Sequence, residues 1–259
     1  MNLGLKEKVI IVTGGAKGIG EGISESLALE SAMVAIVGRN EVDNLKCIEK
    51  IQAIGGQAFS FVAELSDPNQ CKKVIEEIYT KFERIDGLVN NAGINDGVGL
   101  ANGTYEKSIQ SLHSNLIHYY LLAQACLPHL IKTKGSIVNI GSKVAETGQG
   151  GTSAYAASNG GRNALTREWA VELLPHGIRV NCVCPGFVAT PMQDRELSWE
   201  AQLRGTDPET IKKLWINDTP LGRLETPEDV AKVVAFLAGS DADFITGEAI
   251  SVNGGAYMD

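Results

Sequence analysis

The side chains of Tyr155 and Ser142 are of types that could carry out acid–base chemistry on an alcohol. Oxidising an alcohol requires a base for the hydroxyl proton and a hydrogen-bond donor for the carbonyl oxygen that forms. We expect Tyr155 to be the base and Ser142 the donor. A free phenol has a pKa of about 10, so nearby positive charge must favour its ionised form. Four residues later, on the same face if the segment is helical, stands the uncharged Asn159.

A glycine-rich turn near the start of the chain predicts a dinucleotide site. Directly after a β-branched run, it has the sequence Thr13-Gly14-Gly15-Ala16-Lys17-Gly18-Ile19-Gly20. Gly14, Gly18 and Gly20 allow the backbone to turn tightly and to approach a pyrophosphate at a helix N-terminus, with Lys17 and Ile19 in the same turn. Glycines also serve ordinary tight turns, but the position between a strand and a helix favours cofactor binding.

The end of the second predicted strand carries the signal for the type of cofactor. Gly38-Arg39-Asn40 has no carboxylate where an NAD site usually places an acid on the ribose hydroxyls. Arg39 could pair with the 2′-phosphate of NADP, although an arginine at a loop tip can also be merely solvated. We therefore expect NADP(H), with NAD(H) as the alternative. Glu64 and Leu65, after the third strand, are expected at the adenine edge, with a merely exposed glutamate as the alternative.

Seven short apolar runs alternate with longer stretches of helical periodicity. The runs cover residues 9–13, 33–38, 57–62, 88–90, 136–140, 179–183 and 249–252. Strands so uniformly apolar suit a parallel sheet that is covered on both faces and joined by right-handed crossovers. The sequence therefore predicts an α/β fold, a doubly wound Rossmann-type parallel sheet of about seven strands with helices on both faces.

One domain spanning residues 1–259 fits the length of 259 residues and the apolar content of 44%. Within it, residues 187–219 lack a clear strand, are rich in polar residues and carry Trp199 and Trp215, which predicts a substrate lid. The net charge of −8 disfavours nucleic acid and anionic membranes as partners. We expect a cytoplasmic protein, because no apolar run could span a bilayer and the first residues lack a signal-peptide pattern.

Metal and disulfide chemistry have little support in this sequence. The five cysteines form no C-x-x-C pair, and the four histidines show no spacing typical of metal ligands. We expect reduced thiols in the core and no metal site.

Taken together, these residues resemble the short-chain dehydrogenase/reductase family over essentially the whole chain. Further matches in the family's order and spacing are Asn90-Asn91-Ala92-Gly93, Asn115, Ser142, Tyr155 and Pro185-Gly186. The resemblance implies a Rossmann-type subunit, usually in a homotetramer with the C-terminal strand at a subunit contact, that moves a hydride between nicotinamide and a carbinol or carbonyl carbon. It implies catalytic roles for Asn115, Ser142, Tyr155 and the residue at 159. It also implies cofactor contacts from Asn91, Gly93, Tyr155, Asn159, Pro185, Gly186, Val188 and Thr190.

The chain departs from the family at residue 159. The family pattern Y-x-x-x-K has a lysine there, which favours the phenolate and holds the nicotinamide ribose, whereas this sequence has Asn159. A unit charge about 4 Å away is worth about 4 kcal/mol at an effective dielectric of about 20, so we expect severe impairment. Lys143 would point to the opposite face of its segment, and Arg162 lies about 10 Å further along the helix axis. Neither is expected to replace the lysine.

The loop beside the reacting carbon is unusually polar. Its candidate substrate contacts are Lys143, Glu146, Thr147, Gln149 and Thr152. Together with residues 165–170, this loop resembles the family branch that oxidises aldoses such as L-fucose at C1 to the lactone. A polar surface loop without substrate contact is the alternative.

Three functions therefore stay open. The first is an NAD(P)-dependent oxidoreductase that interconverts a secondary alcohol or sugar hemiacetal and the carbonyl or lactone, weakened at Asn159. The second is a carbonyl or keto-acid reductase acting on a smaller substrate. The third is a dinucleotide-binding regulator without catalysis, in which Asn159 is the natural residue.

Overall fold

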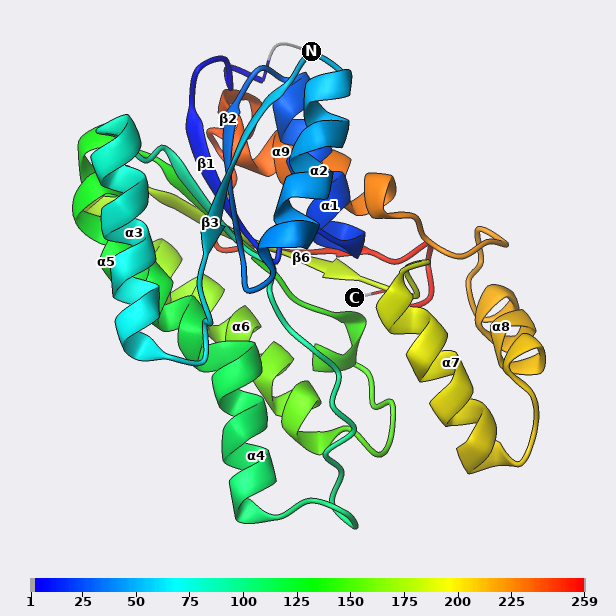
Figure 1. Ribbon diagram of the computed structural model, residues 1–259. Helices are drawn as coiled ribbons and strands as arrows, with labels where there is room; N and C mark the ends of the chain where they lie inside the picture. Colours follow the sequence, from blue (N-terminus) through cyan, green and yellow to red (C-terminus); the bar gives the residue numbers. More distant parts are fainter. Residues whose placement is uncertain (1–2, 259) are drawn as a thin grey trace.

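A single parallel β-sheet is the framework of the computed structural model, which describes residues 3–258 (Figure 1). Its strands are β1 (Val9–Thr13), β2 (Met33–Gly38), β3 (Gln57–Val62), β4 (Gly87–Asn90), β5 (Ser136–Ile140), β6 (Arg179–Pro185) and β7 (Ala249–Val252). They lie in the order β3-β2-β1-β4-β5-β6-β7. The predicted fold is confirmed, and the seven predicted runs are the seven strands, with β4 and β6 slightly longer than expected.

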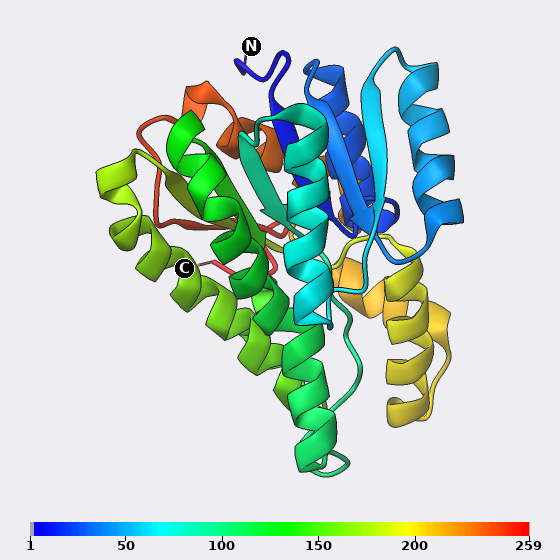
Figure 2. The same cartoon turned by 60° about the vertical axis from the view of Figure 1, so that its left-hand side comes forward.

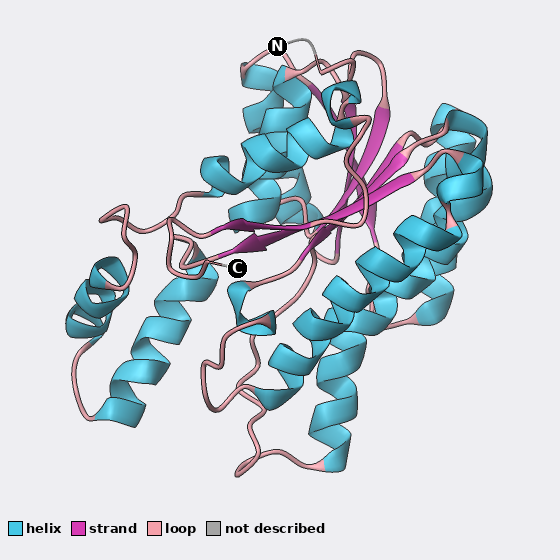
Figure 3. Cartoon of the chain, turned by 180° about the vertical axis from the view of Figure 1, so that it is seen from behind, coloured by secondary structure: helices cyan, strands magenta, loops and turns pink. Residues whose placement is uncertain are grey.

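Helices cover both faces of this sheet (Figures 1 and 3). They are α1 (Gly18–Leu29), α2 (Glu41–Ala53), α3 (Pro68–Phe82), α4 (Tyr105–Leu112), α5 (His118–Thr133), α6 (Ser153–Glu172), α7 (Pro191–Arg204), α8 (Pro208–Asn217) and α9 (Pro227–Ala238). α1, α2 and α9 form one layer, and α3, α5 and α6 form the other. A π-helical turn, η1 (His113–Ile117), joins α4 to α5, and Figure 2 shows these helices beside α6.

The sheet has a hydrophobic core on each face, because successive residues of a strand point to opposite faces. In β1, Ile10 and Val12 pack under the α1 layer, while Val9 and Ile11 pack under the α5 layer. All four are essentially inaccessible to solvent. All five cysteines are buried and unpaired, as expected.

Local sequence signals set where several helices begin. Asp67 accepts a hydrogen bond from the Asn69 amide ahead of α3, and Thr226 forms a capping box with Asp229 at the start of α9. Both helices also have proline in their first turn. These caps satisfy amide groups that a helix start leaves without partners, which is why both starts are readable from sequence.

The predicted lid segment contains no strand but two helices, α7 and α8. They form a hairpin that stands apart from the two layers on the sheet (Figure 1). The hairpin has a small core of its own, in which Leu197, Ala201, Ile211 and Trp215 are buried and Phe187 packs against them. Among residues 3–258, no helix has the length and apolarity required to cross a membrane.

Candidate active site

The glycine turn after β1 has the shape that a pyrophosphate site requires. Gly14 and Gly18 have φ of +60° and +54°, a backbone region that favours glycine. A Cβ added at Gly20 would lie 2.1 Å from the Gly14 carbonyl oxygen. Lys17 precedes α1 without a side-chain cap, which leaves the first amides of that helix available to an anion. These residues fit a dinucleotide cofactor.

Asn91 ties the end of β4 to this turn. Its side-chain Nδ2 donates to the backbone carbonyl oxygens of Thr13 at 2.9 Å and of Gly14 at 3.3 Å. The backbone N–H of Asn91 donates to Thr13 Oγ1 at 2.9 Å. Thr190 approaches from the other side, because a Cβ at Gly18 would meet its side chain at 3.2 Å. The structure thus brings together the predicted cofactor residues from the ends of β1, β4 and β6.

The expected ribose site holds an exposed cation. The Arg39 side chain is 78% exposed, and its Nη1 lies 3.8 Å from Glu64 Oε2. At the neighbouring position, Asn40 caps α2 by accepting from the Val42 amide at 3.0 Å. The Leu65 side chain is buried in the core, so only its backbone could meet the adenine.

Tyr155 and Asn159 share one face of α6, as the spacing predicts. Asn159 Nδ2 donates to the Tyr155 carbonyl oxygen at 2.9 Å. Burial raises the pKa of Tyr155, whereas the charge of Arg162 and hydrogen bonds with Asn159 and Ser142 lower it. Ser142 also accepts a bond from the Val144 amide at 3.3 Å, at the start of the 3-10 turn η2 (Lys143–Ala145). The expected base and donor therefore lie together.

Asn115 lies in the π-helical turn η1 and is fully buried. π-turns interrupt the regular helical hydrogen-bond ladder and are frequent at functional sites. Asn115 Oδ1 accepts from the Ile94 backbone N–H at 2.8 Å, and Asn115 Nδ2 donates to the Ser111 backbone carbonyl oxygen at 3.0 Å. Its side chain thereby ties the loop after β4 to the last turn of α4.

The expectation that Arg162 lies too far from the site is wrong. Its Nη1 donates to Asn159 Oδ1 at 3.0 Å and to the Ile140 oxygen at 2.9 Å, and its Nε donates to the Asn115 oxygen at 2.7 Å. The estimate of about 10 Å counted the rise between backbones. Side chains on a helix lean toward its N-terminus, and arginine is long enough to reach back.

The five predicted substrate contacts lie in the connection between β5 and α6. Glu146 Oε1 accepts from Asn163 Nδ2 at 2.9 Å, and the Thr147 hydroxyl donates to the Lys143 oxygen at 3.1 Å. Gln149 is exposed and Thr152 is buried at the start of α6. Glu146 and Thr147 thus already have hydrogen-bond partners within the protein. A role of these five residues in substrate binding stays a prediction.

Lys143, the first of these five residues, contacts the lid. Its Nζ lies 3.2 Å from the centre of the Phe187 ring, which stacks on Trp215 of the lid. Burial lowers the pKa of Lys143 to about 8. The lysine thus joins the substrate loop to the lid hairpin.

Sequence reasoning missed the pair Asn95 and Glu196. Asn95 Nδ2 donates to Glu196 Oε1 at 2.8 Å, from the loop after β4 to helix α7. Burial raises the pKa of Glu196, whose charge in turn raises that of Tyr155. The only available signal was the place of Asn95, two residues after the Asn-Asn-Ala-Gly motif.

The loop after β6 is held by a buried acid from far along the chain. The Gly186 amide donates to Glu225 Oε2 at 2.8 Å, and Val188 pairs with Glu225 as a parallel bridge. Thr190 Oγ1 then accepts from the Gln193 amide at 3.4 Å and caps α7. This segment carries the remaining predicted cofactor residues, from Pro185 to Thr190.

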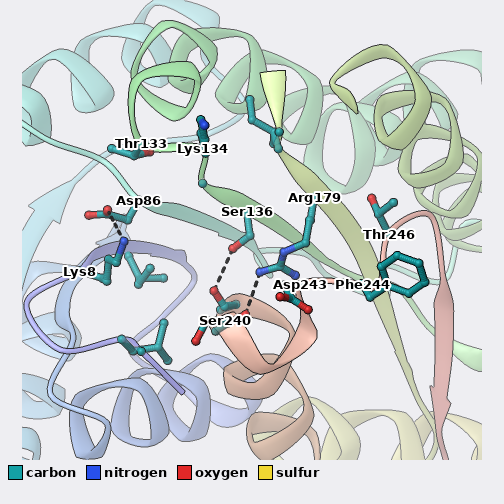
Figure 4. Close-up of a pocket in the computed structure, with 18 of the residues that line it drawn as sticks. Lys8, Asp86, Thr133, Lys134, Ser136, Arg179, Ser240, Asp243, Phe244 and Thr246 are labelled. Atoms are coloured by element: carbon teal, nitrogen blue, oxygen red, sulfur yellow. Dashed lines mark hydrogen bonds and ion pairs between the residues drawn. The ribbon is translucent and has the colours of Figure 1, made fainter. Parts of the chain in front are cut away.

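A separate cavity of about 590 Å³ lies at the amino ends of the strands, away from these residues (Figure 4). Three of its charged groups have partners within the chain: Asp86 and Lys8 lie 3.3 Å apart, and Arg179 donates to the Leu237 and Gly239 carbonyl oxygens at 2.8 Å. Within residues 3–258, no group of three or more His, Cys, Asp or Glu side chains could hold a metal ion.

Comparisons with known proteins agree with this geometry. A family model described as Enoyl-(Acyl carrier protein) reductase matches residues 14–257. The 3-oxoacyl-[acyl-carrier-protein] reductases FabG of Thermotoga maritima and Haemophilus influenzae are each 36% identical over 256 residues, covering 98% of this chain and 99% or 100% of theirs.

Solved structures agree as well. The structure of Cj0485 dehydrogenase has a TM-score of 0.90 at 34% identity and covers 100% of this chain and 98% of its own. A variant actinorhodin polyketide ketoreductase with NADPH has a TM-score of 0.93 at 28% identity, covering 96% and 97%. The chain therefore belongs to the short-chain dehydrogenase/reductase family and is an NAD(P)-dependent oxidoreductase acting on alcohol or carbonyl groups.

Proposed function

We propose that this protein transfers a hydride between NADP(H) and a small polar alcohol or carbonyl compound, with aldoses oxidised at C1 as the first substrate class. The observation that carries this proposal is the hydrogen-bonded pair of Asn95, which is buried, and Glu196, which is partly buried. A carboxylate and an amide beside Tyr155 can bind substrate hydroxyls, since sites of this kind place a few polar groups to fix orientation.

Proton transfer at Tyr155 is the step that the chain's own residues perform. A bound nicotinamide cofactor supplies or takes up the hydride. In the oxidative direction, the Tyr155 phenolate oxygen takes the substrate hydroxyl proton while Ser142 Oγ–H donates to the oxygen that becomes a carbonyl. Reduction runs the same proton back from Tyr155 to the substrate oxygen.

The names of the relatives favour a different substrate, a 3-oxoacyl group on a carrier protein. A long acyl chain gains affinity from an apolar channel, and it would offer no polar partner to the partly buried carboxylate of Glu196. The lid contributes Glu196 to the site by way of its bond to Asn95. We therefore place the polar substrate first and the acyl thioester second.

Lys143 supports a keto acid or hydroxy acid as a further candidate. It is half-buried next to Ser142, and within residues 3–258 no carboxylate lies within ion-pair distance of its Nζ. A substrate carboxylate would supply that partner. The preference for NADP rests on Arg39, whose largely exposed guanidinium could bind a phosphate.

A substrate panel tests the proposal. Aldoses with NADP, 2-keto acids with NADPH, and a 3-oxoacyl thioester with NADPH are assayed on the purified protein and on Glu196→Leu. We expect the highest kcat/KM on an aldose, and a fall of about ten- to hundredfold in Glu196→Leu from the loss of one charge-assisted bond. Tyr155→Phe should lower kcat by about 10²- to 10⁴-fold.

Each other outcome selects a different function. Highest turnover on a keto acid, lost in Lys143→Met, would favour the acid substrate, and highest turnover on the thioester would overturn the polar-substrate proposal. Tight cofactor binding without turnover on any class would favour the non-catalytic regulator.

A further inference from the structure

We infer that Arg162, acting through Asn159, supplies the positive charge that stabilises the phenolate of Tyr155. This inference rests on the proposed proton transfer at Tyr155. It moves the cation one helical turn along α6 from the position of the family lysine. On this view Asn159 and Arg162 together replace the family lysine, and the change at residue 159 does not abolish the site's positive charge.

Arg162 is a buried cation without a counter-charge. Arg162 is only 3% exposed. Within the part of the chain that the structure describes, no carboxylate oxygen lies within 4 Å of its guanidinium nitrogens. Burying a charge costs several kcal/mol unless other groups compensate. A structural role alone could be filled at lower cost by an apolar side chain, so the charge itself calls for an explanation.

Neutral dipoles hold the guanidinium in place. The Asn115 and Ile140 carbonyl oxygens accept from Nε and Nη1, and the Tyr119 ring lies 4.4 Å from Cζ. Carbonyl dipoles and an aromatic face favour a cation but do not cancel its charge. The field of Arg162 therefore persists in the surrounding site.

The space for the guanidinium exists because residue 93 is glycine. A Cβ at Gly93 would lie 2.9 Å from Arg162 Nη2 and 3.0 Å from Asn115 Oδ1. Arg162 thus meets the Asn-Asn-Ala-Gly loop, the π-turn with Asn115 and the end of β5 at once. These are the segments that the family resemblance assigns to the cofactor and the catalytic residues.

Asn159 connects this cation to Tyr155. A guanidinium only donates hydrogen bonds, so the Asn159 amide must turn its oxygen toward Arg162 Nη1, at 3.0 Å. Its nitrogen then faces the other way, toward the turn that carries Tyr155. One N–H of this nitrogen donates to the Tyr155 backbone carbonyl oxygen at 2.9 Å. The amide dipole, with the positive charge of Arg162 behind it, thus occupies the position at which the family pattern has an ammonium.

The other ionisable groups around Tyr155 do not supply this charge. Glu196 from α7 raises the pKa of Tyr155, and Arg162 is the largest influence that opposes burial. On α5, burial and the charge of Arg162 lower the pKa of His118 to about 3, so this imidazole is neutral. Tyr119 on α5 and Cys182 on β6 have raised pKa values and are neutral too.

Four proteins test the inference: the wild type, Arg162→Met, Asn159→Lys, and the double variant with both changes. Arg162→Met should lower kcat by at least a hundredfold and move the rise of kcat/KM with pH upward by one unit or more. Asn159→Lys alone should not gain activity, because it places two cations side by side in a buried site. The double variant restores a single cation and should recover to within about tenfold of the wild type.

The ionisation of Tyr155 gives a readout that does not depend on turnover. Ultraviolet difference titration of the protein without cofactor, with Tyr155→Phe subtracted, should show the same upward shift in Arg162→Met and its reversal in the double variant. Arg167→Met, an exposed change on the same helix, should behave like the wild type. Arg162→Lys keeps the charge and should hold the titration near the wild-type position even if Arg162→Met folds poorly.

Two results would overturn the inference. One is an Arg162→Met protein, folded by circular dichroism, whose pH profile and tyrosine titration match the wild type. The other is Asn159→Lys alone giving the most active protein. The proposed function fails separately, if the titration shifts as described while no substrate class is turned over.

Discussion

At the scale of single residues, Arg39 is where cofactor choice can be measured. In Arg39→Asp the cation that would bind the 2′-phosphate becomes a carboxylate, which repels phosphate and can accept from ribose hydroxyls. We expect NADP to bind about ten- to hundredfold more weakly, the value of one charge-assisted bond, and NAD to be unchanged or tighter. Fluorescence titration with both reduced cofactors measures this, with exposed Arg167→Asp as the control. An equal loss for both cofactors would remove the basis for NADP preference.

Which site residues can be read from sequence depends on whether their spacing is local. The pairing of Tyr155 with Asn159 follows from helical periodicity, and the glycine turn from its place after a strand. The reach of Arg162 to Asn115 and Ile140 could not be predicted, because it joins three elements through a side chain. The family pattern at residue 159 directed attention to a missing charge, and only the fold shows a cation beside it.

At the scale of elements, the five inner strands are predictable because they are buried on both faces and therefore almost uniformly apolar, whereas the edge strands β3 and β7 are only partly buried. Helix α7 gives little periodic apolar signal, because only Leu197 and Ala201 contribute to the small core of the lid. Helix α8 does carry a start signal, the capping Asp207 followed by a proline, which the prediction of a lid did not use. The contact between Asn95 and Glu196 joins residues 101 positions apart, and nothing local announces it.

The closeness of the lid to the body of the protein can be tested at Gly97. The Trp199 ring of α7 lies so near that a Cβ at Gly97 would meet it at 2.2 Å, and Gly97 has φ of +70°. Gly97→Ala should push α7 outward and raise KM about tenfold, equivalent to about 1.4 kcal/mol, with cofactor affinity unchanged. Steady-state kinetics measure this, with Gly148→Ala, which meets no neighbour, as the control. An unchanged KM would show that the lid does not contribute to substrate binding.

The burial of Glu225 against the loop after β6 predicts a dependence of stability on pH. Burial raises the pKa of Glu225 from 4.5 to about 8. Between these values the unfolded chain releases a proton that the folded state retains, so stability falls as pH rises. In Glu225→Gln the loss of unfolding free energy between pH 5 and pH 8 should be smaller by at least about 1.4 kcal/mol, the equivalent of one pKa unit.

Urea unfolding at both pH values measures this difference. Glu228→Gln, at an exposed position nearby, should keep the wild-type slope. A wild-type protein that is more stable at pH 8 than at pH 5, with Glu225→Gln showing the same trend, would contradict a protonated buried acid.

At the scale of the whole molecule, two surfaces have the character of subunit contacts. The first is the face of α4, α5 and α6, where Tyr105 and Val171 are about three-quarters exposed and Tyr120 is half-exposed. The second is the free edge of β7, the last strand of the sheet. Apolar patches and open strand edges are costly to leave in water, and two different self-complementary faces build a closed tetramer.

We therefore expect sedimentation equilibrium to give about four times the chain mass of 27.6 kDa. Val171→Asp places a charge in the helical face and should leave a species of about half that size, because the β7 contact stays intact. Leu29→Asp is the matched control, since Leu29 is 65% exposed on α1 in the opposite layer, and it should not change the mass. A monomeric wild type would refute the tetramer, and a tetrameric Val171→Asp would place the contact elsewhere on the chain.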